Sequence, residues 1–346
     1  MIFLDPILCK TVIVATLCSL GVTEEAAYHV AESLVMTSLR GTDSHGINLF
    51  PHYVRAVKSG RINGQANLTI TQTGDSTTRL DADHAFGHYA GSVAIAEAVK
   101  MALRTGVGAV SVSNSTHFGA AAYFALQATK HNCIGFAFTN ADALVKAHGA
   151  REAFFGTNPI CFAAPLECEE PFCLDMATSL VSWNKVLNFR NRNENIPPDW
   201  AYDKDGVPVV DPILAASLSA VGSYKGFGLG MMVDILCALL SGSPVSRDLL
   251  PMYDSPIEEK RRISHFFLAL SICHFIDPAI FRVSLQALVD RVRALQPLSS
   301  NNSVMVAGDP EKSACALRSK SGIPIEEKKF DELCYTNSTF VDAVRV

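Results

Sequence analysis

The chain has 346 residues, of which 49% are hydrophobic and 18% are charged, and its mean hydropathy is +0.20. This length predicts about two domains with a sizeable core, and the apolar content excludes a disordered chain. The 29 Lys and Arg residues against 34 Asp and Glu give a net charge of −5 without a basic block. A nucleic-acid partner is therefore not expected, because such a protein needs concentrated positive charge.

Neither the apolar stretches nor the cysteines indicate export or a membrane. The longest apolar stretches, residues 11–21 and 266–273, are shorter than the ~18–20 residues that cross a bilayer. Residues 11–21 are preceded by Lys10 as the single cation and lack a small-residue cleavage site, so no secretory signal is predicted. The ten cysteines are scattered without a C-x-x-C pair. We expect reduced, buried thiols in a cytoplasmic protein.

The predicted elements alternate along the chain. Thr23 is positioned to cap a helix that Gly41 ends. Further helices are predicted at 95–103 (ended by Gly106), 120–130, 226–240 and 278–295. Strands are predicted at 108–112, 134–138, 160–164, 172–174 and 266–272. Residues 190–212 and 243–262 are interpreted as a surface connection and a charged irregular stretch. By spacing alone, this α/β alternation indicates βαβ units and a parallel sheet.

Standard cofactor and metal motifs are missing from the sequence. Gly106-Val-Gly108 lacks the third glycine of G-x-G-x-x-G, and Gly226-Phe-Gly228 does not follow an apolar strand. Neither a Walker A loop nor a G-x-S-x-G elbow occurs. His84 and His88 are four residues apart without a neighbouring acid, so we interpret them as loop or edge histidines. No metal site is expected.

Four polar clusters interrupt the apolar pattern. Residues 43–46 (DSHG) follow a helix and offer a histidine beside a hydroxyl, as general acid–base chemistry requires, although a plain loop histidine is the alternative. Residues 114–121 link a strand to a helix and present backbone N–H groups to a phosphate, or bind nothing. Residues 156–159 and 175–179 place hydroxyl and amide groups at strand ends, for a ligand or for turn hydrogen bonds. Lys225 begins a helix, as an anion ligand or a solvated cation.

Taken together in this order, the clusters resemble one family. It comprises the malate/L-lactate dehydrogenases of the type that includes ureidoglycolate dehydrogenase, sulfolactate dehydrogenase and piperideine-2-carboxylate reductase. The segments that carry the resemblance are 39–46 (LRGTDSHG), 114–121 (NSTHFGAA), 156–159 (GTNP), 175–179 (DMATS), 196–200 (IPPDW), 224–226 (YKG) and 307–311 (AGDPE). Each is weak alone, but seven in register over nearly the whole chain are specific.

The resemblance implies an NAD(P)-dependent oxidoreductase that interconverts a 2-oxoacid and a 2-hydroxy acid, such as malate/oxaloacetate or lactate/pyruvate. It implies an α/β protein with a non-Rossmann, predominantly antiparallel NAD(P)-binding domain at 76–277. A helical domain at 1–75 is joined by C-terminal elements around 278–346. The expected partners are the small-molecule substrate and a second copy of the chain in a homodimer.

Residue roles follow from the same resemblance. Ser44 and His45 match the catalytic pair, in which His45 exchanges a proton with the substrate oxygen. Lys185 falls near the active site, and His117 is an alternative proton-transfer residue. The implied substrate-binding residues are Asn48, Tyr53 and Thr157. The implied cofactor contacts are His117, Phe118, Gly119, Ala120, Ala121, Asp175, Met176, Ala177, Lys225, Gly226, Gly308 and Asp309.

One departure bears on the substrate. Relatives usually carry an arginine five residues after the motif serine, where a guanidinium suits a substrate carboxylate, and this chain has Leu49 there. The connection before Tyr224 also looks shorter than usual. Arg55, Arg151 and Lys185 are the cations considered as substitutes. Two alternatives stay open: a relative that binds cofactor without turnover, and an imine reductase acting on a cyclic amino acid. The choice between NAD and NADP is also open.

Overall fold

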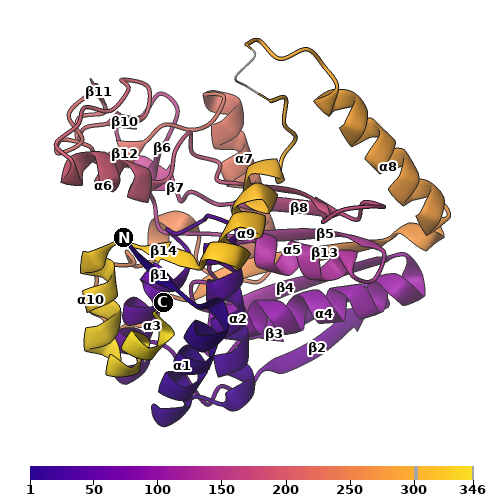
Figure 1. Ribbon diagram of the computed structural model, residues 1–346, viewed down its shortest axis with the longest axis horizontal. Coiled ribbons are helices and arrows are strands. Elements are labelled where there is room, and N and C mark those ends of the chain that lie inside the picture. Colours follow the sequence, from indigo (N-terminus) through magenta and orange to yellow (C-terminus); the bar gives the residue numbers. More distant parts are fainter. Residues whose placement is uncertain (300–302, 345–346) are drawn as a thin grey trace.

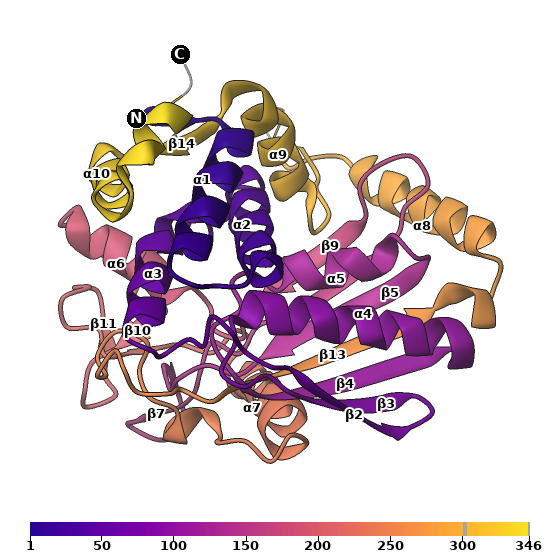
Figure 2. The ribbon, with the colours of Figure 1, turned by 90° about the horizontal axis from the view of Figure 1, so that it is seen from below.

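The computed structural model describes residues 1–299 and 303–344 as a mixed α/β structure around a seven-stranded sheet. Helices lie on both faces of this sheet, and a group of helices from the two parts of the chain nearest its ends packs at one side (Figure 1, Figure 2). The mixed α/β class predicted from the sequence is confirmed.

The large sheet has the strand order β2-β3-β4-β13-β5-β8-β9. Its strands are Thr69–Gly74 (β2), Thr77–Asp81 (β3), Val107–Ser115 (β4), Cys133–Thr139 (β5), Ile160–Ala164 (β8), Phe172–Met176 (β9) and Ile263–Ser271 (β13). Neighbours run antiparallel except β3 and β4. The parallel sheet indicated by spacing is therefore wrong, because β13 arrives from far along the chain and separates β4 from β5. The pairing matches the predominantly antiparallel sheet that the resemblance implies.

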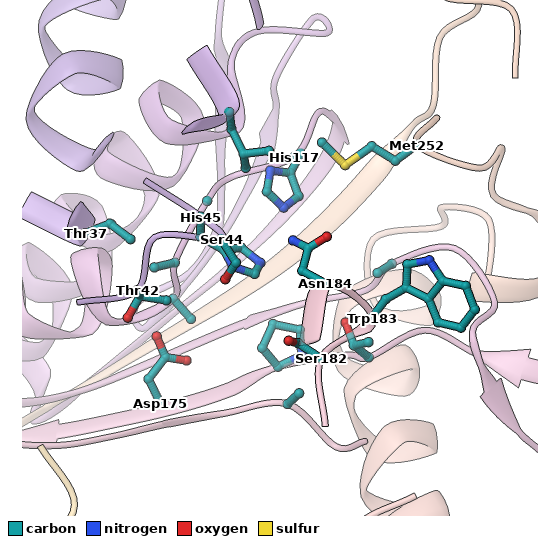
Figure 3. A pocket seen from close by; sticks show the side chains of 18 of the residues that line it. Thr37, Thr42, Ser44, His45, His117, Asp175, Ser182, Trp183, Asn184 and Met252 are labelled. Atoms are coloured by element: carbon teal, nitrogen blue, oxygen red, sulfur yellow. The ribbon is translucent and has the colours of Figure 1, made fainter. Parts of the chain in front are cut away.

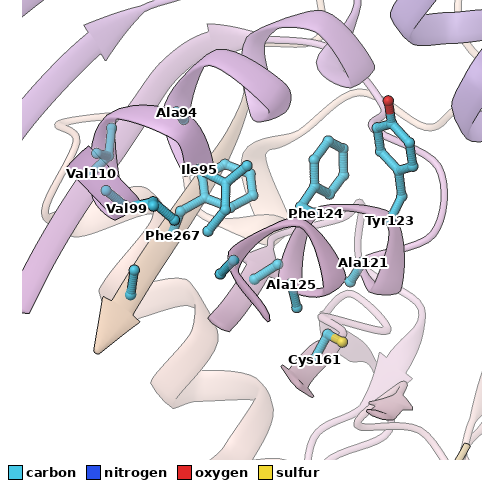
Figure 4. Packing of buried hydrophobic residues seen from close by; sticks show 14 of the residues in the cluster. Ala94, Ile95, Val99, Val110, Ala121, Tyr123, Phe124, Ala125, Cys161 and Phe267 are labelled. Carbon is cyan, nitrogen blue, oxygen red and sulfur yellow. The ribbon is translucent and has the colours of Figure 1, made fainter. Parts of the chain in front are cut away.

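The two faces of the sheet are covered by different helices because strand side chains alternate. Helices α4 (Gly87–Thr105) and α5 (Ala122–Thr129) share one apolar core with the sheet, in which Phe124 and Phe267 meet (Figure 4). On the other face, Phe138 packs with Val233 of α7 (Tyr224–Asp234) and with the π-helical turn η2 (Ile235–Leu239) that follows it. The predicted helix at 226–240 thus begins two residues earlier and ends in a π-helical turn.

Glycines let α4 and α5 approach the sheet closely. A methyl group on Gly108 of β4 would lie 2.0 Å from the Ala98 carbonyl oxygen of α4. On β5, a methyl group on Gly135 would lie 2.4 Å from the Ala125 carbonyl oxygen of α5. Helix α4 ends at Gly106, whose φ of 90° is the left-handed conformation that glycine adopts readily.

A second apolar core joins the N-terminal helices to elements near the C-terminus. It contains Leu17 of α1 (Pro6–Ser19), Leu34 of α2 (Glu24–Leu39), Phe50 of α3 (Phe50–Lys58), Leu333 of α10 (Glu327–Thr336) and Phe340 of the 3-10 helix η5 (Ser338–Ala343). Strand β1 (Ile2–Leu4) pairs antiparallel with β14 (Ile323–Ile325). The predicted cap is confirmed, since the Thr23 hydroxyl accepts from the N–H of Ala26 at 3.3 Å.

A smaller sheet lies beside the large one, in the order β11-β10-β12-β6-β7. Its strands are Val145–Lys146 (β6), Ala153–Phe155 (β7), Ala201–Tyr202 (β10), Pro208–Val209 (β11) and Ser217–Leu218 (β12), and α6 (Trp183–Asn191) packs with it. The interpretation of 190–212 as a surface connection is therefore only partly right. Ile196, Ala201 and Val209 are buried in a core of their own, which the many polar residues around them obscure in the sequence.

Helix α8 (Pro278–Arg293) borders the sheet on the side away from α1 and α3, whereas α9 (Asp309–Ser321) lies beside α2 (Figure 2). Helix α8 is bonded to the loop after β8, with Arg282 Nε 2.9 Å from Glu167 and Gln286 Nε2 2.9 Å from Glu169. Helix α9 leads into β14.

The ten cysteines are free thiols, but they are not uniformly buried as the sequence indicates. Cys168 and Cys273 are exposed, because each lies in a loop or a short turn rather than in a sheet or helix core. Among residues 1–299 and 303–344, no helix combines the length and the apolar character needed to cross a bilayer. The same residues contain no group of three or more His, Cys, Asp or Glu placed to hold a metal ion.

The close approach of α4 predicts the effect of one substitution. Gly108→Ala is expected to lower the free energy of unfolding by about 3 kcal/mol, because the new methyl group would press on the α4 backbone. Gly228→Ala in α7 is the matched control, since nothing lies within 4 Å of the added methyl group. It should leave stability unchanged or raise it by up to about 1 kcal/mol. Urea unfolding measures both; equal stability of the two variants would contradict the packing argument.

Candidate active site

One cavity of about 400 Å³ brings the separated polar clusters together. Its wall contains the following residues that the sequence singled out: Ser44, His45, His117, Gly119, Ala120, Ala121, Thr157, Asp175, Met176 and Ala177. Figure 3 shows Ser44 and His45 in the cavity between Asp175 on one side and His117 on the other. The loop after α2, the β4–α5 turn and the ends of β8 and β9 thus converge on a single space.

In the loop after α2, some residues anchor the loop to the rest of the protein and others line the cavity. Asp43 forms an ion pair with Arg318 of α9, which also donates to the Ser38 carbonyl at 2.6 Å. Gly46 lies so close to Ser38 that an added methyl group would be 2.1 Å from the Ser38 hydroxyl. These contacts hold the two ends of the loop, so that Ser44 and His45 between them face the cavity.

Two histidine rings face each other across this part of the cavity. His45 Nδ1 and the Ser44 hydroxyl are hydrogen-bonded at 2.9 Å, and His117 Nδ1 and the Tyr53 hydroxyl are hydrogen-bonded at 2.7 Å. The ring centroids of His45 and His117 are 5.7 Å apart. Because each Nδ1 already has a partner, Nε2 is the nitrogen that each ring offers to a ligand.

The protein environment keeps both rings neutral near pH 7. Burial lowers the pKa of His45 below its ordinary 6.5. Burial lowers the pKa of His117 well below 6.5, and the positive charge of Arg261 lowers it further. A neutral imidazole has a free nitrogen that can accept a proton, so the pair suits a general base in one direction and, once protonated, a general acid in the other.

Asp175 occupies the N-terminus of α5. Its Oδ2 accepts a hydrogen bond from the N–H of Ala122 at 2.8 Å. The carboxylate therefore occupies one of the backbone N–H groups at the helix start, which the sequence indicates as a phosphate site. Enclosure by the surrounding protein raises the pKa of Asp175 to about 6, although its side chain is open to the space of the cavity.

Asn158 explains why Thr157 is held at the cavity wall. Asn158 is fully buried with a φ of 30°, and its Oδ1 accepts from the N–H of Ala141 at 3.0 Å. Its Nδ2 donates to the Gly230 carbonyl at 2.9 Å and lies 3.4 Å from the Asp234 carboxylate. The amide side chain thus ties β8 to α7, and this role is structural.

Several residues implied by the resemblance lie outside the cavity wall. They are Asn48, Tyr53, Phe118, Lys185, Lys225, Gly226, Gly308 and Asp309. Tyr53 stands behind His117, and Phe118 stacks on the buried His265 with centroids 4.7 Å apart. Asn48 is half-buried beside Leu49, which does line the cavity.

The predicted lysines are both exposed. Lys185 Nζ lies 4.5 Å from the centre of the Trp200 ring, and Lys225 Nζ lies 6.0 Å from that of Tyr224. Gly226 is packed so tightly on Val221 that no side chain fits there. Gly308 backs onto Cys173, and Asp309 forms an ion pair with Arg293 at 2.6 Å.

The cavity also contains residues that sequence reasoning missed. They include Arg40, Asp142, Trp183, Asn184, Met252, Tyr253 and Arg261. The candidate substitutes Arg55, Arg151 and Lys185 are exposed instead, and none lines the cavity. The only signal for Arg261 in the sequence is a pair of arginines directly before a strand, inside a stretch whose charges indicate a solvated loop.

Comparisons with known proteins identify the family of this chain. The family model described as malate/L-lactate dehydrogenase matches residues 8–334. A malate dehydrogenase of Pyrococcus abyssi is 36% identical over 93% of this chain and 90% of its own length. A ureidoglycolate dehydrogenase (NAD(+)) of Escherichia coli is 34% identical over 92% of this chain and 90% of its own. The crystal structure of malate dehydrogenase from Entamoeba histolytica superposes with a TM-score of 0.92 at 29% identity, covering 99% of both chains.

The protein is thus an oxidoreductase, with a fold shared by dehydrogenases and a cavity lined by paired histidines. The chain belongs to the malate/L-lactate dehydrogenase family.

The role of Asn158 can be tested apart from any activity. Asn158→Ala is expected to destabilise the fold by about 2–4 kcal/mol, because it leaves the Ala141 N–H and the Gly230 carbonyl without their side-chain partner. Asn188→Ala, on the exposed side of α6, should change stability by less than about 0.5 kcal/mol. Thermal unfolding compares the two; a small effect at both positions would show that Asn158 does not tie β8 to α7.

Proposed function

We propose that the protein is an NAD- or NADP-dependent dehydrogenase that interconverts a 2-oxoacid and a 2-hydroxy acid, either malate/oxaloacetate or lactate/pyruvate. The observation that carries the proposal is the Ser44–His45 pair facing His117 inside the cavity. Family membership supports the reaction type. Relatives differ in their substrates, as the malate and ureidoglycolate dehydrogenases show, so we do not choose between the two pairs of acids.

Small residues on one wall fit a nicotinamide dinucleotide. Gly119, Ala120, Ala121 and Ala177 give a wall without bulky side chains, and Gly119 has a φ of 78° with His88 directly behind it. We infer that this wall, with Asp175 and Met176, holds the cofactor in a non-Rossmann domain. When bound, the cofactor supplies or accepts the hydride.

Side chains of the protein transfer the proton. In reduction, the protonated His45 ring donates its Nε2 proton to the substrate carbonyl oxygen as negative charge develops there and becomes neutral. In oxidation, the neutral Nε2 removes the hydroxyl proton. Ser44 holds Nδ1 and so orients the ring. His117, held by Tyr53, is the alternative proton carrier, and Thr157 is a substrate contact on the cavity wall.

The division into a helical unit (1–75 with C-terminal elements around 278–346) and a cofactor unit (76–277) stays a proposal. The apolar core shared by α1–α3, β14, α10 and η5 supports it for the last part of the chain. Helix α8 is instead bonded to residues 167–169.

We also propose a homodimer in the cytoplasm. Apolar side chains on the outer side of α7 and η2 are exposed in the single chain and would be covered by a second copy; they are Leu229, Met231, Met232, Ile235, Leu239 and Leu240. The ten free thiols fit a reducing compartment.

His45→Ala is the direct test of the proton role. We expect kcat for 2-oxoacid reduction to fall about 10²–10⁴-fold, with NADH or NADPH binding within about twofold of wild type, because the ring moves a proton and does not build the cofactor wall. His131→Ala, at an exposed histidine, is the control and should retain full activity. Absorbance assays of both cofactors against small 2-oxoacids and cyclic imines provide the readout.

Other outcomes of this screen point elsewhere. Wild-type turnover surviving in His45→Ala would remove that residue from its role. Cofactor binding without turnover of any compound would favour a non-catalytic relative, and turnover of cyclic imines alone would favour an imine reductase.

The lowered pKa of His45 gives a pH dependence with opposite signs in the two directions. Reduction needs the protonated ring, so its kcat/KM should fall as pH rises through a pKa below 6.5; oxidation needs the neutral ring and should rise over the same range. Profiles in both directions between about pH 5 and 9 check this. An inflection clearly above 6.5 would assign proton transfer to another group.

A further inference from the structure

A buried guanidinium stands on the cavity wall near His117. Among the residues described at 1–299 and 303–344, the cavity wall includes two arginines, Arg40 and Arg261. Arg40 is bonded to Glu170 at 2.8 Å, and its charge acts on Asp175, at the proposed cofactor wall. Arg261 acts on His117 instead, since its charge is one cause of the lowered pKa of that ring.

The pairing of β4 with β13 brings the segments that carry His117 and Arg261 to the same end of the large sheet. Ile263 at the start of β13 pairs with Ser115 at the end of β4, and the two strands run antiparallel. Arg261 lies two residues before Ile263, and His117 lies two residues after Ser115. The two residues therefore lie in the segments next to this pair of strand ends, and both line the cavity.

The side chain of Arg261 is fixed but not fully bonded. Its side chain is 5% exposed, its Nε donates to the Leu250 carbonyl at 2.8 Å, and one of its amino groups, Nη2, forms an ion pair with Asp142. Within the described part of the chain, Nη1 makes no hydrogen bond. A buried arginine with an unbonded amino group beside a cavity has N–H donors left for an anion, and the planar group matches the geometry of a carboxylate.

We propose that Arg261 binds the carboxylate of the 2-oxoacid and thereby sets specificity for acids over neutral ketones. This inference rests on the proposed function. Arg261 would supply the positive charge for the carboxylate that Leu49 cannot supply. Arg55, Arg151 and Lys185 are exposed and do not line the cavity. Arg261, His45 and His117 line the same cavity, so a carboxylate bound at Arg261 leaves the adjacent carbonyl in the space that the two histidines also line.

The alternative role for Arg261 is purely structural, since its pair with Asp142 also ties the 250–262 stretch to the residues after β5. The two roles differ in one measurable quantity, the ratio of kcat/KM for a 2-oxoacid to that for its uncharged methyl ester. A structural defect lowers both values together, whereas the loss of a carboxylate ligand lowers the value for the acid alone.

The experiment compares wild type, Arg261→Gln, Arg261→Lys and Arg262→Gln with pyruvate and methyl pyruvate, or with whichever 2-oxoacid turns over fastest and its ester. Arg261→Gln is expected to lower the acid-to-ester ratio on the order of 100-fold, mostly through KM for the acid, with KM for the dinucleotide unchanged. Arg261→Lys should recover part of the ratio, because it keeps the charge but not the planar fork. The neighbouring Arg262 is exposed, so Arg262→Gln should keep the wild-type ratio.

An unchanged ratio in Arg261→Gln would overturn the inference, as would equal loss in Arg262→Gln. If Arg261→Gln does not fold because Asp142 is left unpaired, the double variant Arg261→Gln/Asp142→Asn removes the buried pair together, and the same fall in the ratio is required of it.

Calorimetric binding of oxamate, an unreactive analogue of a 2-oxoacid, separates this inference from the proposed function. Loss of oxamate binding in Arg261→Gln but not in Arg262→Gln supports the carboxylate site even if wild type reduces no acid, in which case the proposed function alone fails. Oxamate binding that is equal in wild type and Arg261→Gln overturns the carboxylate site whatever the activity.

Discussion

The antiparallel hydrogen bonding of β13 between β4 and β5 is the interaction on which the candidate site depends. It brings the end of β4, two residues before His117, next to the start of β13, two residues after Arg261. The fully buried His265 of β13 reinforces the junction, with Nε2 2.8 Å from the Ser115 hydroxyl and Nδ1 2.7 Å from the Thr139 hydroxyl. One imidazole thus links three strands at the edge of the cavity.

Burial is also the main source of the site's chemistry. The same enclosure that lowers the histidine pKa values raises that of Asp175. In each case burial disfavours the charged form of the side chain, because the protein interior solvates a charge less well than water does. Arg261 keeps its positive charge in such surroundings because it forms an ion pair with Asp142. The guanidinium therefore stands on the same cavity wall as the two neutral histidine rings.

Glycine and alanine shape the cavity as much as the polar residues do. Gly108 and Gly135 allow α4 and α5 to lie directly on the sheet, and this sets the position of the β4–α5 turn. Within that turn, Gly119 adopts a left-handed conformation against His88, and the alanines that follow keep the wall open. The narrow side chains are therefore part of the site, although they carry no chemistry.

The sequence by itself determined five of the helices and five of the seven strands of the large sheet. It also determined the cap at Thr23 and the clusters that supply Ser44, His45, His117, Thr157 and Asp175. Local periodicity and short polar motifs depend on neighbours along the chain, and these can be recognised without a fold. Tertiary structure alone decided the insertion of β13, the burial of Arg261 and the exposure of Lys185. The insertion of β13 depends on pairing between segments more than 100 residues apart. The other two could not be predicted because a charged residue looks the same in sequence whether it faces water or a partner.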